Sequence, residues 1–277
     1  MQFGGYTFVT DEGIHPAELA RALEERGFTS FFVPEHTHMP VEHTPYPGGG
    51  EVPRPYFRSL DPLVTLATAA AVTERLVLGT SIALVIQRDP IILAKEVASL
   101  DHLSGGRVEL GVGAGWNRPE IANHGVDPAR RLRVLRERVL AMKEIWTSER
   151  AEFHGEHVDF APMYSWPKPV RAPHPPVLLG GWGPTTFERI TDYADGWIAP
   201  PPFGPEKLAE GVAELRRRAE EKGRPRPTVT AYVHGPDQRV IDGFGEAGVD
   251  RLLLSLPAAG REESLRRLDE FVTRIAI

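Results

Sequence analysis

The sequence contains no cysteine among its 277 residues. Disulfide bonds, thiolate nucleophiles and zinc sites built from thiolates are therefore all excluded. Long apolar runs are lacking as well, since no window approaches the roughly 18 consecutive apolar residues that would span a bilayer. Positive charge is not in excess, because 32 Lys and Arg residues stand against 38 Asp and Glu residues, a net charge of −6. Neither nucleic acid nor an anionic membrane is an expected partner of such a surface.

The first residues, MQFGGYTF, hold no basic segment that leads into an apolar run, so a secretory signal is not indicated. Together with the lack of disulfides, this favours a cytoplasmic protein whose partner is a small molecule. With 41% hydrophobic and 25% charged residues, the chain can bury a full core. Composition alone leaves one large α/β domain and two smaller ones open.

Strand-like and helix-like segments alternate along the chain. The expected strands cover residues 2–8, 29–34, 76–84, 107–113, 176–181, 196–199, 228–233 and 251–255. Eight helices are expected after them, the last at residues 262–275. Each of the first seven opens with a residue followed by proline, at the position where the missing N–H costs nothing. These prolines are Pro16, Pro62, Pro90, Pro128, Pro184, Pro205 and Pro236.

Eight βα units in a row, over a length close to the roughly 250 residues typical of the fold, predict a single (β/α)8 TIM barrel over residues 1–277. The alternation is interrupted after the fourth helix, at about residues 148–175. This segment contains a hairpin pattern at residues 151–160 and then a proline-rich run, and we interpret it as an insertion. A Rossmann dehydrogenase is not indicated, because Gly4-Gly5 lies inside the first strand and forms no GxGxxG motif.

In a (β/α)8 barrel the ligand site forms at the C-terminal ends of the strands. The second strand ends in Glu35 and His36. His36 is a candidate proton donor or electrostatic partner, and Glu35 could accept a hydrogen bond from a heterocyclic N–H. On position alone, a hydrogen-bonded loop histidine and a solvated glutamate remain equally consistent. Residues 35–59, rich in Pro and Gly, are expected to form a lid or binding loop.

The fourth and fifth strands both end in glycine-rich runs. Glycine lets backbone N–H groups approach a ligand closely, and the N-terminus of a helix favours an anion. We favour a phosphate cradle here, and tight βα turns without a ligand are the alternative. The residues of the expected cradle are Gly113, Ala114, Gly115, Gly180, Gly181, Trp182 and Gly183.

A metal-dependent hydrolase is the weakest alternative. The spacing of His36 and His38 resembles a metal-binding pair, but the later strand ends lack further His, Asp and Glu side chains at the expected places. We therefore expect no metal.

Three segments, LDHLSGGRVELGVGAGWN, PVLLGGWG and YADGWI, resemble in their order and spacing the bacterial luciferase-like monooxygenase superfamily. The resemblance covers nearly the whole chain and is closest to the branch that uses the deazaflavin coenzyme F420. It implies a homodimeric oxidoreductase that passes a hydride between coenzyme F420 and an unidentified organic substrate. An FMN-dependent monooxygenase of the same superfamily is one alternative, and a barrel that binds the cofactor without catalysis is another.

The resemblance also implies roles for individual residues. Glu35 and His36 match the family's acidic residue and histidine that face the flavin-like ring, although the usual acid there is aspartate. His36 would supply or accept the proton that accompanies the hydride, and Glu35 would orient the ring. Ser81-Ile82 matches a non-proline cis peptide behind the ring. The glycine ends match backbone that holds the cofactor's phosphate and side chain.

One departure from the family concerns the substrate. Sugar-phosphate dehydrogenases of the family have a catalytic Glu directly after the GxGxG of the fourth strand, where this chain has Trp116. The resemblance therefore argues against oxidation of a sugar phosphate. We expect Trp116 and Asn117 to line a pocket for an apolar or conjugated substrate, and the alternative for Trp116 is a packed side chain that anchors the loop.

Overall fold

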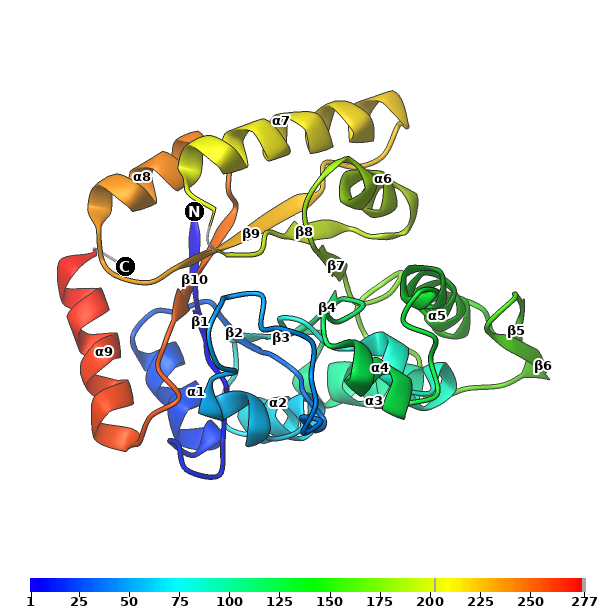
Figure 1. Cartoon of the computed structure of the whole chain (residues 1–277), viewed down its shortest axis with the longest axis horizontal. Coiled ribbons are helices and arrows are strands. Elements are labelled where there is room, and N and C mark those ends of the chain that lie inside the picture. The colour runs from blue at the N-terminus through cyan, green and yellow to red at the C-terminus, as the bar shows by residue number, and fades with distance from the viewer. Residues whose placement is uncertain (202, 276–277) are drawn as a thin grey trace.

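The structure, a computed structural model, describes residues 1–201 and 203–275. Eight parallel strands close into a barrel in the order β1-β10-β9-β8-β7-β4-β3-β2, which confirms the predicted TIM barrel (Figure 1). Closure is made by β1, which pairs with both β10 and β2. The strands are β1 Gln2–Tyr6, β2 Ser30–Val33, β3 Val77–Thr80, β4 Val108–Val112, β7 Val177–Gly180, β8 Gly196–Ile198, β9 Thr228–Val233 and β10 Arg251–Ser255.

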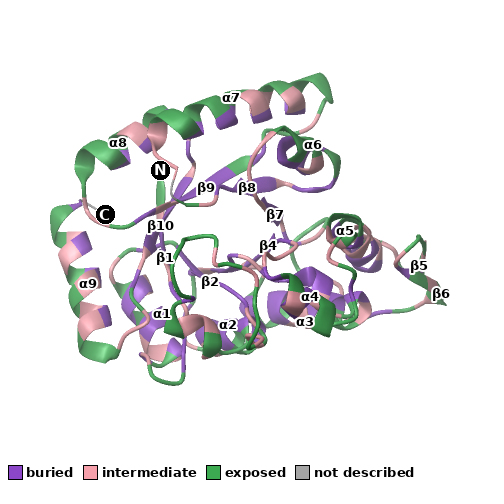
Figure 2. Cartoon of the chain, in the orientation of Figure 1, coloured by how far each residue is buried: buried purple, intermediate pink, exposed green. Residues whose placement is uncertain are grey.

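Helices surround the barrel and bury one face against it, as the purple inner and green outer sides show in Figure 2. A parallel strand covered on both sides is mostly apolar, and β2 fits this, since all four of its residues are buried and three of them, Phe31, Phe32 and Val33, are apolar. No described helix combines the length and the apolar character that a bilayer crossing requires. The helices are α1 Pro16–Glu25, α2 Pro62–Ala70, α3 Pro90–Ser104, α4 Arg118–Asn123, α5 Arg131–Thr147, α6 Pro184–Tyr193, α7 Pro205–Glu221, α8 Gln238–Glu246 and α9 Arg261–Arg274.

Proline begins five of the helices as predicted, namely α1, α2, α3, α6 and α7. The predicted starts at Pro128 and Pro236 are wrong. Helix α5 begins at Arg131, after a turn that contains Pro128. Helix α8 begins at Gln238, because the side chain of Asp237 accepts hydrogen bonds from the first free backbone N–H groups. The short helix α4, directly after β4, was not predicted.

The insertion after α5 contains the expected hairpin. Strands β5 (Ala151–His154) and β6 (Asp159–Met163) pair antiparallel, apart from the barrel, and stand beside α5 in Figure 1. The carboxylate of Glu137 on α5 accepts hydrogen bonds from the backbone N–H groups of residues 156–158. This contact fixes the hairpin turn to the helix.

The third strand is shorter than predicted. β3 ends at Thr80, and the peptide between Ser81 and Ile82 is cis, as the resemblance implied. Beyond it, Ala83 forms an isolated bridge with Val112 of β4. The side chain of Ile82 packs against a small apolar cluster inside the barrel, formed by Phe32, Leu178, Ile198 and Leu253. Ile82 therefore covers the end of the barrel core at the C-terminal ends of the strands.

Candidate active site

A cavity of about 830 Å³ lies at the C-terminal ends of the strands. Its size falls within the roughly 300–1,000 Å³ typical of sites for cofactors and small molecules. Asn117 and Gly183 do not line this cavity. The predicted site residues that do are Glu35, His36, Ser81, Ile82, Gly113, Ala114, Gly115, Trp116, Gly180, Gly181 and Trp182.

His36 is held by a carboxylate that sequence reasoning missed. Its Nδ1 lies 2.9 and 3.1 Å from the two carboxylate oxygens of Glu120 on α4. The side chains of both residues are almost completely buried, at 6% and 2% exposed. A carboxylate only accepts hydrogen bonds, so Nδ1 carries the proton. Nε2 has no hydrogen-bond partner among the described residues, which leaves it available to a ligand in the cavity.

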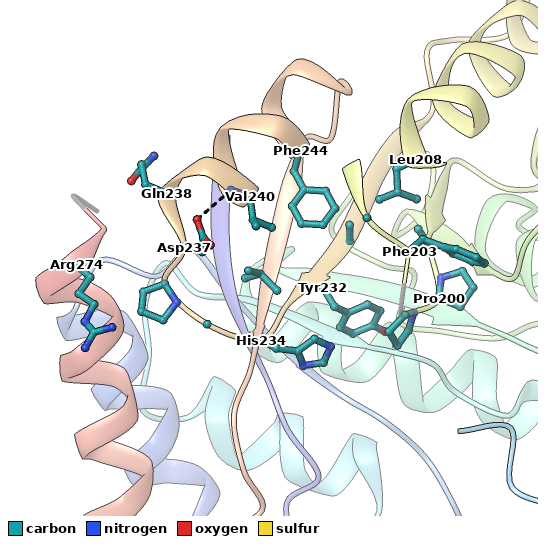
Figure 3. Close-up of a pocket in the computed structure, with 17 residues that line it drawn as sticks. Pro200, Phe203, Leu208, Tyr232, His234, Asp237, Gln238, Val240, Phe244 and Arg274 are labelled. Atoms are coloured by element: carbon teal, nitrogen blue, oxygen red, sulfur yellow. Dashed lines mark hydrogen bonds between the residues drawn. The ribbon is translucent and has the colours of Figure 1, made fainter. Parts of the chain in front are cut away.

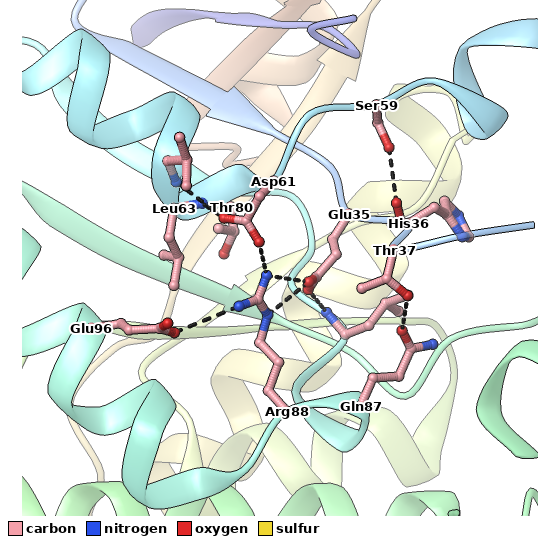
Figure 4. A network of polar contacts seen from close by, with 12 residues as sticks. Glu35, His36, Thr37, Ser59, Asp61, Leu63, Thr80, Gln87, Arg88 and Glu96 are labelled. Carbon is pink, nitrogen blue, oxygen red and sulfur yellow. Dashed lines mark hydrogen bonds and ion pairs between the residues drawn. The ribbon is translucent and has the colours of Figure 1, made fainter. Parts of the chain in front are cut away.

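Both carboxylate oxygens of Glu35, the expected acceptor for a heterocyclic N–H, are hydrogen-bonded to the protein. Its carboxylate accepts a hydrogen bond from the backbone N–H of Leu84 at 2.6 Å and another from Nε of Arg88 at 2.7 Å. The guanidinium of Arg88 also pairs with Asp61, the cap of α2, and with Glu96 of α3 (Figure 4). Glu35 is only 2% exposed, so these partners compensate the desolvation of its charge. The geometry makes Glu35 an anchor of the loop after β3.

Ile82 lies between the ends of two neighbouring strands. A Cβ added at Gly113 or Gly180 would press against the Ile82 side chain, so these two glycines make room for it. Ser81 forms a hydrogen bond with the hydroxyl of Tyr232, which projects from β9 into the same cavity. The centre of the cavity therefore has an apolar floor with one hydroxyl pair beside it.

The glycine-rich end of β7 shapes the side of the cavity next to α6, whereas Gly115 after β4 lies near Leu84 and Ile121 of α4. Gly115 and Gly181 have φ of 69° and 133°, a region that side chains other than glycine rarely adopt. No side chain caps the first turn of α6, and Thr185 and Thr186 of that turn line the cavity. Backbone donors near an uncapped helix N-terminus suit a phosphate group. The residues present therefore fit a cofactor that carries a phosphate.

Aromatic rings form the opposite side. The centroid of Trp116 lies 5.8 Å from Tyr46 and 6.5 Å from Tyr56, and all three line the cavity. Tyr56 in turn lies 4.9 Å from the ring of His36 and 4.4 Å from Phe8. Tyr46 and Tyr56 come from the loop of residues 35–59, so that loop supplies part of the wall.

Asn117 holds this loop rather than lining the pocket. Its side chain is 1% exposed, accepts a hydrogen bond from the backbone N–H of Thr44 at 3.1 Å and donates to the sulfur of Met39. Ser59, at the other end of the loop, donates to the backbone oxygen of His36. The prediction that Asn117 lines the pocket is therefore wrong, because its amide satisfies the loop backbone.

A second cavity of about 680 Å³ adjoins the first at the ends of β8 and β9. Tyr232 and His234 line both cavities, and Phe203, Val240 and Phe244 line the second one only (Figure 3). Asp237 lies at its edge, but its carboxylate is used to cap α8. Within residues 1–201 and 203–275, no group of three or more His, Asp or Glu side chains is arranged to hold a metal ion.

Glu120 escaped sequence reasoning because it lies 84 residues from His36 and on a helix that was not expected. The signal was present in Asn117-Arg118-Pro119-Glu120, since a polar residue, a proline and an acidic residue in succession are typical of the start of a helix. Tyr6 and Tyr232 were missed because a tyrosine inside a strand more often belongs to the core.

The chain is thus a (β/α)8-barrel protein whose strand ends hold a cofactor-sized cavity and a buried histidine–carboxylate pair. Within that class, the family "Luciferase-like monooxygenase" matches residues 12–239. The chain belongs to this family.

Relatives by sequence include Rv0953c of Mycobacterium tuberculosis, an uncharacterized protein that is 41% identical over 100% of this chain and 99% of its own length. The F420-dependent glucose-6-phosphate dehydrogenase of Nakamurella multipartita is 33% identical over 74% of this chain and 60% of its own length. The FMNH(2)-dependent dimethylsulfone monooxygenase of Pseudomonas putida is 30% identical over 48% of this chain and 38% of its own length. The family thus contains enzymes that use either a deazaflavin or a flavin.

Solved structures share the fold. The monooxygenase RslO1 of Streptomyces bottropensis superposes with a TM-score of 0.81 at 21% identity, over 100% of this chain and 99% of its own. An F420-dependent secondary alcohol dehydrogenase, solved with an F420-acetone adduct, gives a TM-score of 0.79 at 20% identity, over 99% and 98% of the two chains. At this identity the likeness concerns the fold alone.

The burial of the tyrosines leads to a prediction about their titration. Burial, together with the neighbouring phenols of Tyr232, Tyr56 and Tyr46, raises the pKa of Tyr6 well above its usual value. Burial raises the pKa of Tyr232 to about 12, and it also raises that of Tyr56. Tyr193, outside the cavity, has a pKa raised by burial to about 12. Four of the six tyrosines should therefore stay protonated at about pH 11, where an unfolded chain ionises most of its phenols.

The measurement is the absorbance of phenolate at about pH 11 in the native protein and in a denaturant, with circular dichroism to show that the native sample stays folded. The native sample should lack the absorbance of about four tyrosines. Equal absorbance in the two samples while the fold is retained would contradict the buried aromatic wall.

Proposed function

We propose that this protein is an oxidoreductase that binds coenzyme F420 and transfers a hydride between the cofactor and a neutral, largely apolar organic substrate. The observation that carries the proposal is the buried pair of His36 and Glu120 beside an apolar floor and an aromatic wall in one cavity. When bound, the cofactor supplies or accepts the hydride at its ring carbon. The protein then has to place the ring, exclude water and handle one proton.

His36 handles the proton in this proposal. With Nδ1–H donated to Glu120, the free Nε2 can accept the proton of a substrate hydroxyl as the hydride leaves the adjacent carbon. In the reverse direction the imidazolium returns the proton to the developing alkoxide. The carboxylate of Glu120 fixes the tautomer and stabilises the imidazolium, as a buried acid does beside a general base in other enzymes.

Ile82 and the glycine ends place the cofactor. The Ile82 side chain offers an apolar support for one face of the ring, and Ser81 with Tyr232 offers hydroxyl groups near its edge. Gly115, Gly181 and the first turn of α6 would hold the phosphate. Glu35 acts as a positioning residue, because its charge is shared between Leu84 and Arg88. The loop of residues 35–59 covers the substrate side and excludes water.

The aromatic wall supports an apolar or conjugated substrate. Trp116 stands at the place of the family's sugar-phosphate acid, and it packs against Tyr46 and Tyr56 rather than against a charged group. The ionisable side chains His36 and Glu35 line the cavity near this wall, and both have protein partners. A sugar phosphate would find no basic side chain on that side of the site.

An FMN-dependent monooxygenase is the second candidate, favoured by the relative from Pseudomonas putida. The two candidates differ in chemistry because a deazaflavin does not readily activate oxygen. The F420-dependent relative matches a larger share of this chain, 74% against 48%, and for this reason we place F420 first.

Binding of the two cofactors separates the candidates. Trp116 and Trp182 line the cavity, so a bound ring system should quench their fluorescence. We expect titration with F420 to saturate this quenching at least about tenfold more tightly than titration with FMN, which is about 1.4 kcal/mol in binding free energy. Tight binding of FMN and no binding of F420 would refute the choice of cofactor.

Substitutions test the histidine–carboxylate pair. His36→Ala should lower turnover of any substrate found by about 10²- to 10⁴-fold, the usual contribution of a general base. Without its acceptor, in Glu120→Ala, the proton of the His36 ring should no longer be held on Nδ1. In Glu120→Gln it should stay on Nδ1, because an amide oxygen still accepts a hydrogen bond from Nδ1–H. Nitrogen-15 NMR of the imidazole reads the tautomer without any substrate.

His38→Ala is the matched control, since His38 is bonded to Thr37 and Asn123 and does not line the cavity. It should leave turnover and the His36 signal unchanged. A wild-type His36 that carries its proton on Nε2, or full turnover by His36→Ala, would show that the proton role is misassigned.

We also propose a homodimer. Val64 on α2 and Ile92 on the neighbouring α3 are apolar side chains that are 66% and 59% exposed, and we place the contact with a second copy there. Analytical ultracentrifugation should give twice the chain mass of 30.7 kDa, and the double substitution Val64→Asp with Ile92→Asp should give a monomer. A wild-type monomer at micromolar concentration would rule the dimer out.

A further inference from the structure

The second cavity, at the ends of β8 and β9, has a mainly apolar lining (Figure 3). Its volume of about 680 Å³ is large enough for a ligand of its own. Val240, near the start of α8, lines this cavity and is 36% exposed although it is apolar. The apolar side chains of the lining include Phe203, Leu208, Ala231, Val233, Val240 and Phe244.

Most ionisable side chains of this lining are used by the protein itself. The carboxylate of Asp237 caps α8, and the guanidinium of Arg274 lies 3.4 Å from a carboxylate oxygen of Glu270. Among the described residues, the other ionisable side chains of the lining are Tyr232 and His234, which also line the central cavity. Away from that boundary, the second cavity therefore fits an apolar group better than a charged one.

The two cavities share part of their wall. Pro200, Pro201, Tyr232 and His234 line both of them. Tyr232 is fixed at this boundary, because its hydroxyl is hydrogen-bonded to Ser81. His234 is exposed and forms no side-chain hydrogen bond within residues 1–201 and 203–275, so its ring can turn without the loss of a bond. The boundary therefore consists of one fixed ring and one ring that is free to turn.

Stacked aromatic rings also connect the two cavities. The ring of Trp182, which lines the central cavity, lies 4.3 Å from the ring of Phe203, which lines the second one. Trp182 is held in place by Phe187 and Trp197, at 5.9 and 5.5 Å between ring centroids. The wall between the cavities is therefore apolar on this side as well.

We propose that the second cavity binds an extended apolar arm of the substrate, whose reacting hydroxyl or carbonyl group lies at His36. The inference rests on the proposed function and deepens it, because it defines the substrate as an alcohol or ketone that carries a long hydrocarbon arm. The aromatic rings near His36 would contact the carbon atoms next to the reacting group, and the side chains around Val240 would contact the far end. Affinity should then increase with the length of the arm, since each buried CH2 group adds to it.

Binding of straight-chain alcohols, from butanol to decanol, to the protein without a cofactor tests this proposal. We expect the affinity to rise about three- to fourfold for each added CH2 group until the second cavity is filled. NMR locates the two ends of the ligand. Decanol should shift the methyl signals of Leu208 and Val240 together with the nitrogen-15 signal of the His36 ring, whereas butanol should shift the His36 signal alone.

Two substitutions at Val240 close the second cavity in different ways. Val240→Trp fills it, and Val240→Asp places a carboxylate among its apolar side chains. Each should lower the affinity for decanol by at least about tenfold, the effect of two or more CH2 groups that are no longer buried, and should leave that for butanol unchanged.

Arg239→Trp is the matched control, because Arg239 is the preceding residue of α8, is exposed and lines neither cavity. It adds the same side chain as Val240→Trp and should bind decanol as the wild type does. Thermal unfolding should show that all three variants are folded.

The proposal is overturned if affinity does not depend on chain length, or if Val240→Trp keeps the full dependence. A shift at Val240 without one at His36 would also overturn it, because the second cavity would then be a separate site. The same holds if bound F420 itself shifts Val240 and excludes decanol, since the cavity would then hold part of the cofactor. Failure of the protein to bind F420 would instead refute the proposed function, and it is measured separately from the binding of the alcohols.

Discussion

The ion pair of Glu35 and Arg88 is the contact on which the geometry of the site depends. Glu35 lies two residues after the end of β2, and its carboxylate binds the backbone N–H of Leu84, just after the cis peptide, and the guanidinium of Arg88. Arg88 then reaches the cap of α2 and the side of α3. The pair therefore fixes His36, its neighbour in sequence, and Ile82, the floor of the cavity, relative to each other. Removing one partner from such a buried pair typically costs about 3–5 kcal/mol, because the other charge is left without compensation.

The residues that line the cavity around this ion pair differ in chemistry from one element to the next. His36, Tyr46 and Tyr56 come from the loop of residues 35–59 after β2, and Trp116 and Glu120 reach the same part of the cavity from the segment after β4. The glycine ends and the start of α6 lie on the side of β4 and β7. Under the proposed function, the cofactor's phosphate would bind on the side of β7 and α6, and a neutral substrate would bind beside the aromatic rings. This arrangement agrees with a family whose members share a barrel and differ in cofactor and substrate.

The sequence predicted the features that depend on local pattern. Alternating strands and helices, prolines at helix starts and glycines at strand ends are local signals, and the barrel and part of the cavity lining were predicted from them. The contacts that the sequence did not predict depend on where side chains point in the tertiary structure. The carboxylate of Glu35 pairs with Arg88, 53 residues away, and Glu120 reaches His36 from a short helix that was not predicted. The side chain of Asn117 likewise bonds to the backbone of the loop at Thr44. The alternating pattern of a strand does not fix the rotamer of a residue that follows the strand.

A crystal structure of the protein with F420 bound tests the central claim most directly. The account predicts that the ring lies on Ile82 with its reacting carbon facing the Nε2 atom of His36, and that the phosphate lies at Gly115, Gly181 and the first turn of α6. A ring that lies in the second cavity behind Tyr232, or one that faces away from His36, would contradict it.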